Sequence, residues 1–265
     1  MTTVEISSGQ LIAGYGLLLF PIVIFLWHSV PLLSSTFTSV LRMTVQLLFI
    51  GFYLEYLFLW NNIWLNAAWI AVMVLVADAS IVKGCGLRLR LYWFPLALAL
   101  SVGVLIPLFF LVLMIIRPAP LFDARYVVPI AGMILGNCLR ADIVGIHGFY
   151  NALRKNEKVY FHSLSCGARL REAIHPFLRE ALNAALAPTI ATMATMGVVS
   201  LPGMMTGVIL GGADPVTAIK YQIAIMLAIF SGTAITVTVG IYLTLPISFT
   251  AFGILKHEIF AANNR

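Results

Sequence analysis

Charged residues are scarce in this chain, and their scarcity limits the class of protein. Asp, Glu, Lys and Arg make up 10% of its 265 residues, 61% of the sequence is hydrophobic, and the mean hydropathy is +1.00. A soluble domain carries about a quarter charged residues, because its surface must face water. The composition therefore excludes a soluble globule and predicts a single integral membrane domain over 1–265.

Cysteine is scarce too, and the common catalytic motifs are absent. Cys85, Cys138 and Cys166 have no CxxC spacing, which argues against a disulfide framework or a zinc site. No GxxxxGK[S/T] motif occurs, so any ATP-Mg is expected on a partner subunit and no cofactor on this chain. No Ser-His-Asp, Cys-His or HExxH arrangement appears, and we expect no catalytic residue.

What the chain has instead is long apolar stretches. A helix needs about 20 mostly apolar residues to cross a bilayer. Seven stretches qualify: 9–30, 36–59, 63–82, 91–116, 125–146, 188–211 and 216–245. We therefore expect an all-α integral membrane fold of seven transmembrane helices. The first Lys or Arg is Arg42, so no basic signal-peptide region precedes the first stretch, which is expected to remain as a span.

Lys and Arg are distributed unequally between the two sides of these spans. With the N-terminus outside, the cytoplasmic side receives Lys83, Arg88, Arg90, Arg154, Lys155, Lys158, Arg169, Arg171, Arg179, Lys256 and Arg265. The outer side receives Arg117, Arg125 and Lys220, while Arg42 and Arg140 fall within spans. Cytoplasmic loops are enriched in these cations, which predicts a cytoplasmic C-terminus. Cations placed between apolar runs also argue against a nucleic-acid partner.

One long polar insert, over 148–187, separates the fifth and sixth expected spans and is cytoplasmic in this topology. Its apolar residues recur at helical spacing: Ile174, Phe177, Leu178, Ala181 and Leu182. Such an amphipathic helix lies along the membrane surface or against a partner protein. Pro188 is expected to mark the entry to the sixth span.

Small residues recur at four-residue spacing in the last three expected spans. The sixth carries Gly203, Gly207 and Gly211, the fifth Gly132 and Gly136, and the seventh Ala228, Gly232, Thr236 and Gly240. Small residues allow close approach of membrane helices, so these spans are expected to form a tightly packed centre, with a dimer face as the alternative. Pro202 within the sixth span predicts a kink suited to a gate.

Polar side chains at membrane depth are functional candidates because they are costly there. Arg42, Gln46, Asp78 and Asn137 are the candidates for a polar pore lining. For Arg42 and Asp78, an ion pair between adjacent helices is the alternative interpretation.

A second set contains ligands for soft or borderline metal ions. It consists of Cys138, Asp142, His147, Met193, Met196, Met204 and Met205. Helical spacing alone does not bring ligands together, so ordinary packing is the alternative for each of them.

Several segments together resemble the FetB-type ABC permeases. They are VPIAGMILGN (128–137), LSCGA (164–168), APT (187–189) and, most specifically, VSLPGMMTGVILGGADPVTAIKYQI (199–223). RMTVQLLFIGFYLEYLF, which contains Arg42 and Gln46, also looks like that family's second span. The resemblance extends from Arg42 to about Ile225.

The resemblance implies a permease subunit that works with a separate ABC ATPase subunit in the bacterial inner (cytoplasmic) membrane, surrounded by membrane lipid. Our hypothesis is a homodimer of permeases with two ATPase subunits. Bacterial relatives are linked to iron export, and plant relatives to aluminium tolerance with a proposed sugar-nucleotide cargo. It also implies that a cytoplasmic loop couples to the ATPase. The matching residues are Ser163, Leu164, Ser165, Gly167, Ala168, Arg169 and Arg171, although the EAA triplet of such loops is absent.

Three other functions remain open. They are an ATP-independent channel or secondary carrier, an ABC permease for a non-metal cargo such as a sugar nucleotide, and a membrane scaffold. The two internal repeats typical of many secondary transporters are not evident in the sequence.

Overall fold

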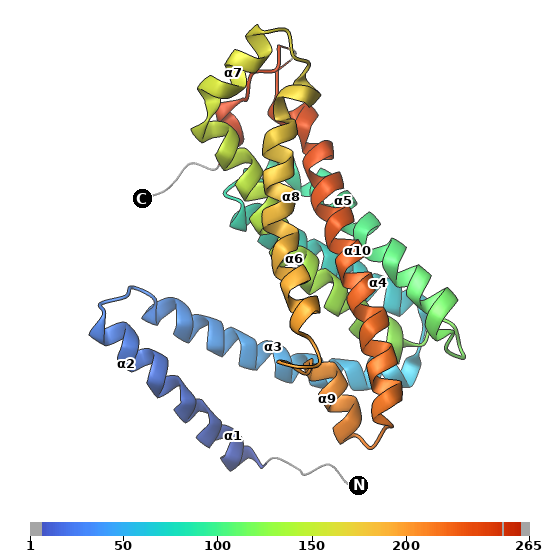
Figure 1. Ribbon diagram of the computed structural model, residues 1–265. Coiled ribbons are helices and arrows are strands. Elements are labelled where there is room, and N and C mark those ends of the chain that lie inside the picture. Colours follow the sequence, from blue (N-terminus) through green and yellow to red (C-terminus); the bar gives the residue numbers. More distant parts are fainter. Residues whose placement is uncertain (1–6, 251, 261–265) are drawn as a thin grey trace.

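The computed structural model describes residues 7–250 and 252–260, and helices dominate them (Figure 1). Arg265, one of the cations used to predict topology, lies outside the described residues. The elements are α1 (Ser8–Gly14), η1 (Tyr15–Leu18), α2 (Leu19–Trp27), α3 (Leu33–Trp60), α4 (Ile63–Gly84), α5 (Leu89–Phe110), η2 (Leu111–Ile116), α6 (Ala124–Lys155), α7 (Glu157–Ser165), α8 (Leu170–Thr195), α9 (Gly203–Leu210), α10 (Pro215–Ser248) and η3 (His257–Ile259). The predicted all-α membrane fold is confirmed.

Six segments are long and apolar enough to cross a membrane. They are Gly9–Trp27, Leu33–Trp60, Ile63–Gly84, Leu89–Ile116, Ala124–Lys155 and Pro215–Ser248. The seventh expected span, 188–211, is not one continuous helix, because it is divided between α8 and α9 by the non-helical residues 196–202. The prediction of a kink at Pro202 therefore understated the change in the chain, which is a complete break.

The 148–187 segment is not a separate surface helix either. It comprises the end of α6, all of α7 and most of α8, and Pro188 lies inside α8 rather than at a boundary. The apolar residues Ile174, Phe177 and Ala181 are buried, because α8 packs along α6 and α10. The amphipathic pattern was correct, but its apolar face covers the bundle of this same chain.

The core of the bundle is the crossing of α5 and α10. A Cβ atom added to Gly232 would lie 2.8 Å from the carbonyl oxygen of Gly103, so neither position has room for a side chain. Glycine permits this close approach of two backbones in a membrane, where small residues replace the hydrophobic force as the basis of packing. Cys138 of α6 lies against the same crossing, 3.4 Å from that Cβ position.

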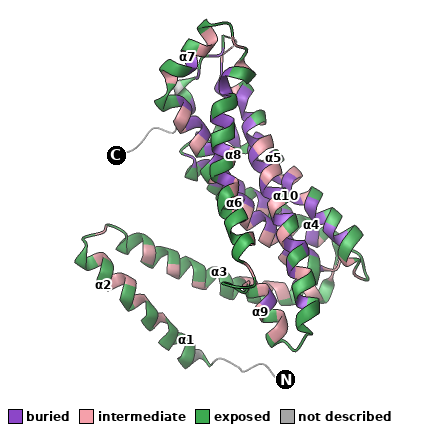
Figure 2. Cartoon of the chain, viewed as in Figure 1, coloured by how far each residue is buried: buried purple, intermediate pink, exposed green. Residues whose placement is uncertain are grey.

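The first three helices behave differently from the rest. The spans that contain α1, α2 and α3 have none of their apolar windows buried, whereas the windows of α6 and α10 are half buried. Figures 1 and 2 show α2 and most of α3 as an exposed hairpin that projects from the bundle. The hairpin is joined to the bundle near Leu57, which packs with Ala124 and Val128.

The end of the molecule that carries α7 also holds the C-terminal segment and many of the cations. There the backbone N–H of Arg88 donates to the carbonyl of Ile259 at 3.0 Å, and the Arg154 guanidinium lies 4.8 Å from the centre of the Phe260 ring. A buried hydroxyl cluster fastens α5, α6 and α10 at this end: Tyr150 Oη donates to Thr244 Oγ1 at 2.7 Å and lies 2.6 Å from Ser248 Oγ. Tyr92 Oη lies 2.7 Å from the same serine.

Candidate functional site

A cavity of about 610 Å³ lies beside the break between α8 and α9. It is bounded by α6, by α8 and α9 with the residues between them, and by α10. This size falls in the range of sites for small ligands, about 300–1,000 Å³. Irregular backbone at membrane depth is tolerated only where protein buries it or where it lines a water-filled cavity. The cavity therefore accounts for the non-helical residues between α8 and α9.

The local sequence accounts for the break. Met196, the C-cap residue of α8, is extended, and Gly197 follows in the left-handed region with φ of 88°. Glycine adopts this conformation at helix C-termini without steric cost. Pro202 then disfavours helical geometry at Leu201 and is the N-cap of α9. The Gly197 N–H donates to the Ser200 carbonyl at 2.9 Å, so the intervening turn closes on itself.

Two polar side chains of α6 line the cavity. Asn137 Nδ2 donates to the Met133 carbonyl at 2.8 Å, and Arg140 Nε donates to the Gly136 carbonyl at 3.3 Å. Both side chains are therefore held against their own helix. A guanidinium has five N–H donors, so one bond to Gly136 leaves most of the donors of Arg140 available to a ligand.

The opposite walls contribute hydroxyl and amide groups. Thr189 and Thr192 of α8, Ser200 of the break and Gln222 of α10 belong to the lining. Gln222 is buried, and its Oε1 has no hydrogen-bond partner among the described residues. An unpartnered polar atom is expensive inside a membrane bundle, which is consistent with a functional position.

Thioethers are the other feature of the lining. Met196 and Met204, both predicted as weak metal ligands, lie at the cavity together with Met133 and Met226, which were not among the predicted ligands. Met193 and Met205 are not part of the lining, and Met205 is buried. Of the predicted pore residues, Asn137 alone reaches this cavity.

The remaining members of the metal set do not converge. Cys138 and Asp142 are buried in the core, and His147 Nδ1 lies 3.2 Å from the Cys85 carbonyl oxygen. Among the described residues, no cluster of three or more His, Cys, Asp or Glu side chains could hold a metal ion. Asp142 instead lies beside Thr236 of α10 and near Asp78 of α4.

Arg42, Gln46 and Asp78 lie apart from the cavity. Arg42 and Gln46 are exposed on α3, whereas Asp78 is buried on α4. The ion pair considered for Arg42 and Asp78 is not formed within the described part of the chain, because α3 packs on α6 near its own C-terminal end.

Two of the three predicted packing glycines, Gly203 and Gly207, lie in α9 and are open, and the third, Gly211, is the C-cap of that helix. A Cβ atom at Gly203 or Gly207 would meet nothing within 4 Å, and at Gly211 it would approach backbone carbonyls of its own helix. Gly203 and Pro202 line the cavity instead. The expectation of a tight centre holds for Gly232 of α10 and fails for α9, while Gly103 of α5, which is part of that centre, was missed.

The predicted coupling residues gather at the turn between α7 and α8. Gly167, with φ of 91°, joins the two helices, and the backbone N–H of Arg169 donates to Glu172 Oε2 at 2.8 Å to begin α8. Ser165, Gly167, Arg169 and Arg171 are exposed, whereas Ser163, Leu164 and Ala168 are half-buried.

Tyr160 of α7 fastens this helix to the C-terminal segment. It is buried, and its hydroxyl donates to the Gly253 carbonyl at 2.5 Å. Burial raises the pKa of Tyr160 to about 12, so the donor keeps its proton at neutral pH.

Gln222 and Arg140, which line the cavity, were also missed as site residues. Each is a polar residue inside an apolar span, and this signal was present in the sequence.

The fold and the cavity define a multi-pass α-helical membrane protein with a broken helix beside a polar cavity. The chain belongs to the Uncharacterised protein family UPF0014, whose model matches residues 8–249. It is 31% identical to the UPF0014 membrane protein YjkA of Bacillus subtilis, over 83% of this chain and 86% of that one.

Two further relatives carry functional names. The chain is 32% identical to Protein ALUMINUM SENSITIVE 3 of Arabidopsis thaliana, over 85% of this chain and 81% of that one. It is 33% identical to the "Probable iron export permease protein FetB" of Escherichia coli, over 78% of each chain. No solved structure matches the chain.

Proposed function

We propose that this chain is the membrane-spanning permease subunit of an ABC transporter of the inner membrane. In this proposal it forms a homodimer with two separate ATPase subunits, which bind ATP-Mg, and exports its cargo through the cavity at the α8–α9 break. The observation that carries the proposal is the break itself, because it lies beside a cavity lined by α6 and α10, two helices long and apolar enough to cross a membrane. The kinship with a protein named as an export permease supports it.

The α7–α8 turn is the surface expected to contact the ATPase. It lies at the end of the molecule where Lys155, Lys158, Arg169 and Arg171 gather, which the positive-inside rule assigns to the cytoplasm (Figure 1). Because α8 is continuous from this turn to the break, although it contains Pro176 and Pro188, a movement of the turn would be transmitted along one helix to the cavity. ATP would favour one of two arrangements by binding that state more tightly.

The first test is ATPase activity of the chain reconstituted with a candidate ATPase in proteoliposomes. A Gly167→Leu variant is expected to assemble with the ATPase but to lose the coupling between ATP hydrolysis and transport. Gly212→Leu is the matched control, because Gly212 has φ of 93° and the same free space but lies between α9 and α10 at the other end. Normal transport by Gly167→Leu would refute this role for the turn.

Failure to form a complex with any candidate ATPase would argue against the ABC proposal as a whole. Transport by the purified chain without ATP would then favour a channel or secondary carrier. Absence of transport under either condition would leave the scaffold function.

For the cargo, a metal ion and an anionic solute make opposite demands on the lining. Four methionine thioethers supply ligands for soft ions, and the relationship to the FetB protein suggests iron. However, the lining contains Arg140 and no Asp, Glu, His or Cys. A permanent positive charge repels metal cations and binds phosphate or carboxylate groups well. This observation favours a second candidate, an anionic non-metal cargo such as a sugar nucleotide.

Two variants separate these cargoes. ATP hydrolysis would be measured with ferrous iron and, separately, with uridine diphosphate glucose. A metal cargo predicts stimulation by iron that is lost in the double variant Met196→Leu, Met204→Leu and retained in Arg140→Gln. An anionic cargo predicts the reverse pattern with the sugar nucleotide. Leucine keeps the volume of methionine, so the double variant removes sulfur with little change in packing.

A further inference from the structure

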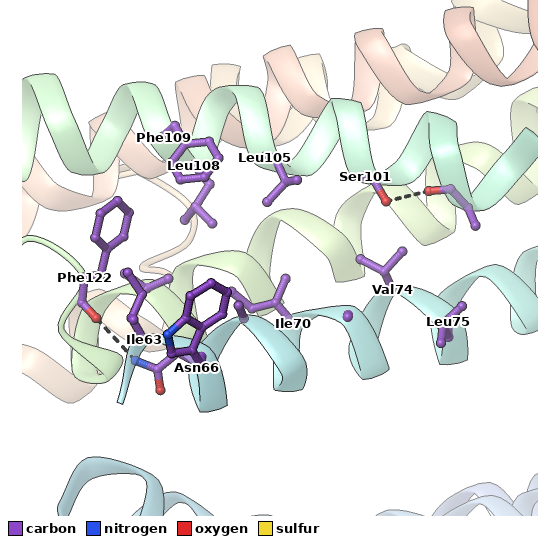
Figure 3. Close-up of a pocket in the computed structure, with 15 residues that line it drawn as sticks. Ile63, Asn66, Ile70, Val74, Leu75, Ser101, Leu105, Leu108, Phe109 and Phe122 are labelled. Atoms are coloured by element: carbon purple, nitrogen blue, oxygen red, sulfur yellow. Dashed lines mark hydrogen bonds between the residues drawn. The ribbon is translucent and has the colours of Figure 1, made fainter. Parts of the chain in front are cut away.

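A second cavity, of about 570 Å³, lies between α4 and α5, away from the α8–α9 break. Figure 3 shows Ile70 and Val74 of α4 facing Leu105 and Leu108 of α5, with Phe122 at one end. The 15 lining residues are apolar except Asn66 and Ser101. We propose that this groove holds one acyl chain of a membrane phospholipid as a stable part of the folded protein. The proposal rests on the membrane location alone and is independent of the transported cargo.

The position of the groove matches one leaflet. The α4 lining runs from Ile63, the first residue of the helix, to Leu75, which is about 18 Å at 1.5 Å per residue. The hydrocarbon core is about 30 Å thick, so the groove extends from the membrane boundary to just beyond the midplane. Trp64, which is 80% exposed, stands at the boundary end, where amphipathic rings reside.

The two polar side chains do not require a polar ligand deep in the groove. Ser101 Oγ donates to the carbonyl of Ala97 at 2.7 Å, so its own helix supplies its acceptor. Asn66 lies in the first turn of α4, near the boundary, where its Nδ2 donates to the carbonyl of Phe122 at 3.3 Å (Figure 3). Its buried Oδ1 has no hydrogen-bond partner among the described residues, so the unpartnered polar atom of the groove is at the boundary end. The midplane half of the groove therefore presents apolar surface, which suits the methylene portion of a lipid.

Other occupants fit less well. Water is not stable in an apolar cavity without two or more polar partners. A helix of a second copy cannot lie within the groove, because a cylinder about 10 Å wide and 18 Å long occupies about 1,400 Å³, and it would reach the lining only with side chains from outside. An empty groove would forfeit dispersion contacts along its whole lining, whereas the surrounding lipid offers chains that restore them.

The test uses phosphatidylglycerol with a photoreactive diazirine at the middle of one acyl chain, reconstituted with the full chain in vesicles. After a chase with unlabelled lipid, crosslinks are expected to persist at Ala71, Val74 and Leu105. They should disappear from the exposed lipid-facing residues Val76 and Phe94, which are 62% and 63% exposed. Equal loss from both sets would overturn the proposal, since it would show only exchanging annular lipid.

The second part of the test fills the groove with a larger side chain. Ala71→Trp places an indole among the lining residues, and persistent crosslinking is expected to fall about tenfold, because steric overlap displaces the chain. Val76→Trp is the matched control on an outer face of the same helix, and it should retain the wild-type signal. Undiminished crosslinking in a folded Ala71→Trp variant would refute the site. If that variant does not fold, the wild-type chase alone decides.

Discussion

The crossing of α5 and α10 and the break between α8 and α9 are both rich in glycine, yet they use it in opposite ways. At the crossing, Gly103 and Gly232 bring two backbones together with no room for a Cβ atom. Near the break, Gly203 and Gly207 have nothing within 4 Å, and Gly197 serves a turn with positive φ. A glycine motif in a membrane sequence therefore indicates close approach, an open cavity wall or a turn, and the tertiary contacts decide which.

The largest expected effect tests the crossing. Gly103→Ala places a methyl group against Thr236 and the Gly232 carbonyl, and the overlap should cost about 1–3 kcal/mol of stability. Thermal unfolding in detergent would measure it. Gly136→Ala is the control, since that helical glycine has free space and its substitution should be neutral or stabilising. Equal melting temperatures for the two variants would contradict the close crossing.

The hydroxyl cluster that fastens the same helices gives the next effect. Tyr150→Phe removes the donor to Thr244 and the contact with Ser248, and should cost about 1–2 kcal/mol. Both partners keep bonds to carbonyls of α10, which limits the loss. Tyr242→Phe, on an exposed side chain of α10, should unfold like wild type in the same assay. A cluster without structural importance would make the two variants indistinguishable.

At the break, the effect should be smaller and local. Gly197→Ala forces a Cβ atom into a left-handed conformation, at about 1–2 kcal/mol for the residue. Because the turn can relax into the cavity, we expect less than this in global stability and faster amide exchange over 195–203. Exchange that increases throughout α10 instead would show that the break is as tightly coupled to the core as the crossing is.

The smallest effect is expected in α9. Gly207→Ala adds a methyl group in open space and raises helix propensity, so stability should rise by about 0.5–1 kcal/mol. The same variant tests the alternative that Gly203, Gly207 and Gly211 form a dimer face. In that case the methyl group would weaken association, and sedimentation in detergent would detect a shift toward the monomer.

The sequence predicted most of the membrane architecture because lipid imposes simple demands. Six spans match the expected stretches: Gly9–Trp27 and the spans in α3, α4, α5 with η2, α6 and α10. The one large difference at an end is in α6, which continues to Lys155, nine residues beyond the expected end at 146. The error at 188–211 came from the same rule. Its composition is apolar enough, but Gly197 and Pro202 end one helix and begin another.

The site was harder to predict than the fold. Asn137, Met196, Met204, Pro202 and Gly203 were candidates that reach the cavity, while Arg42 and Asp78 were candidates that do not. Polar residues at membrane depth can be recognised in a sequence, but which of them share a cavity depends on helix rotation and on partners distant in the chain. Gln222 and Asn137, which are 85 positions apart in the sequence, meet at one cavity because α6 and α10 pack together.

The sequence alone determined that this protein resides in a membrane, where most of its long helices lie, and that its cations favour one end. These properties follow from composition and from short-range rules of helix formation. Only the tertiary structure decided that Gly103 meets Gly232, that α9 stands open beside a polar cavity, and that α4 and α5 leave an apolar groove between them. The physical reason is that packing between membrane helices depends on shape, and shape arises only when residues from several helices come together.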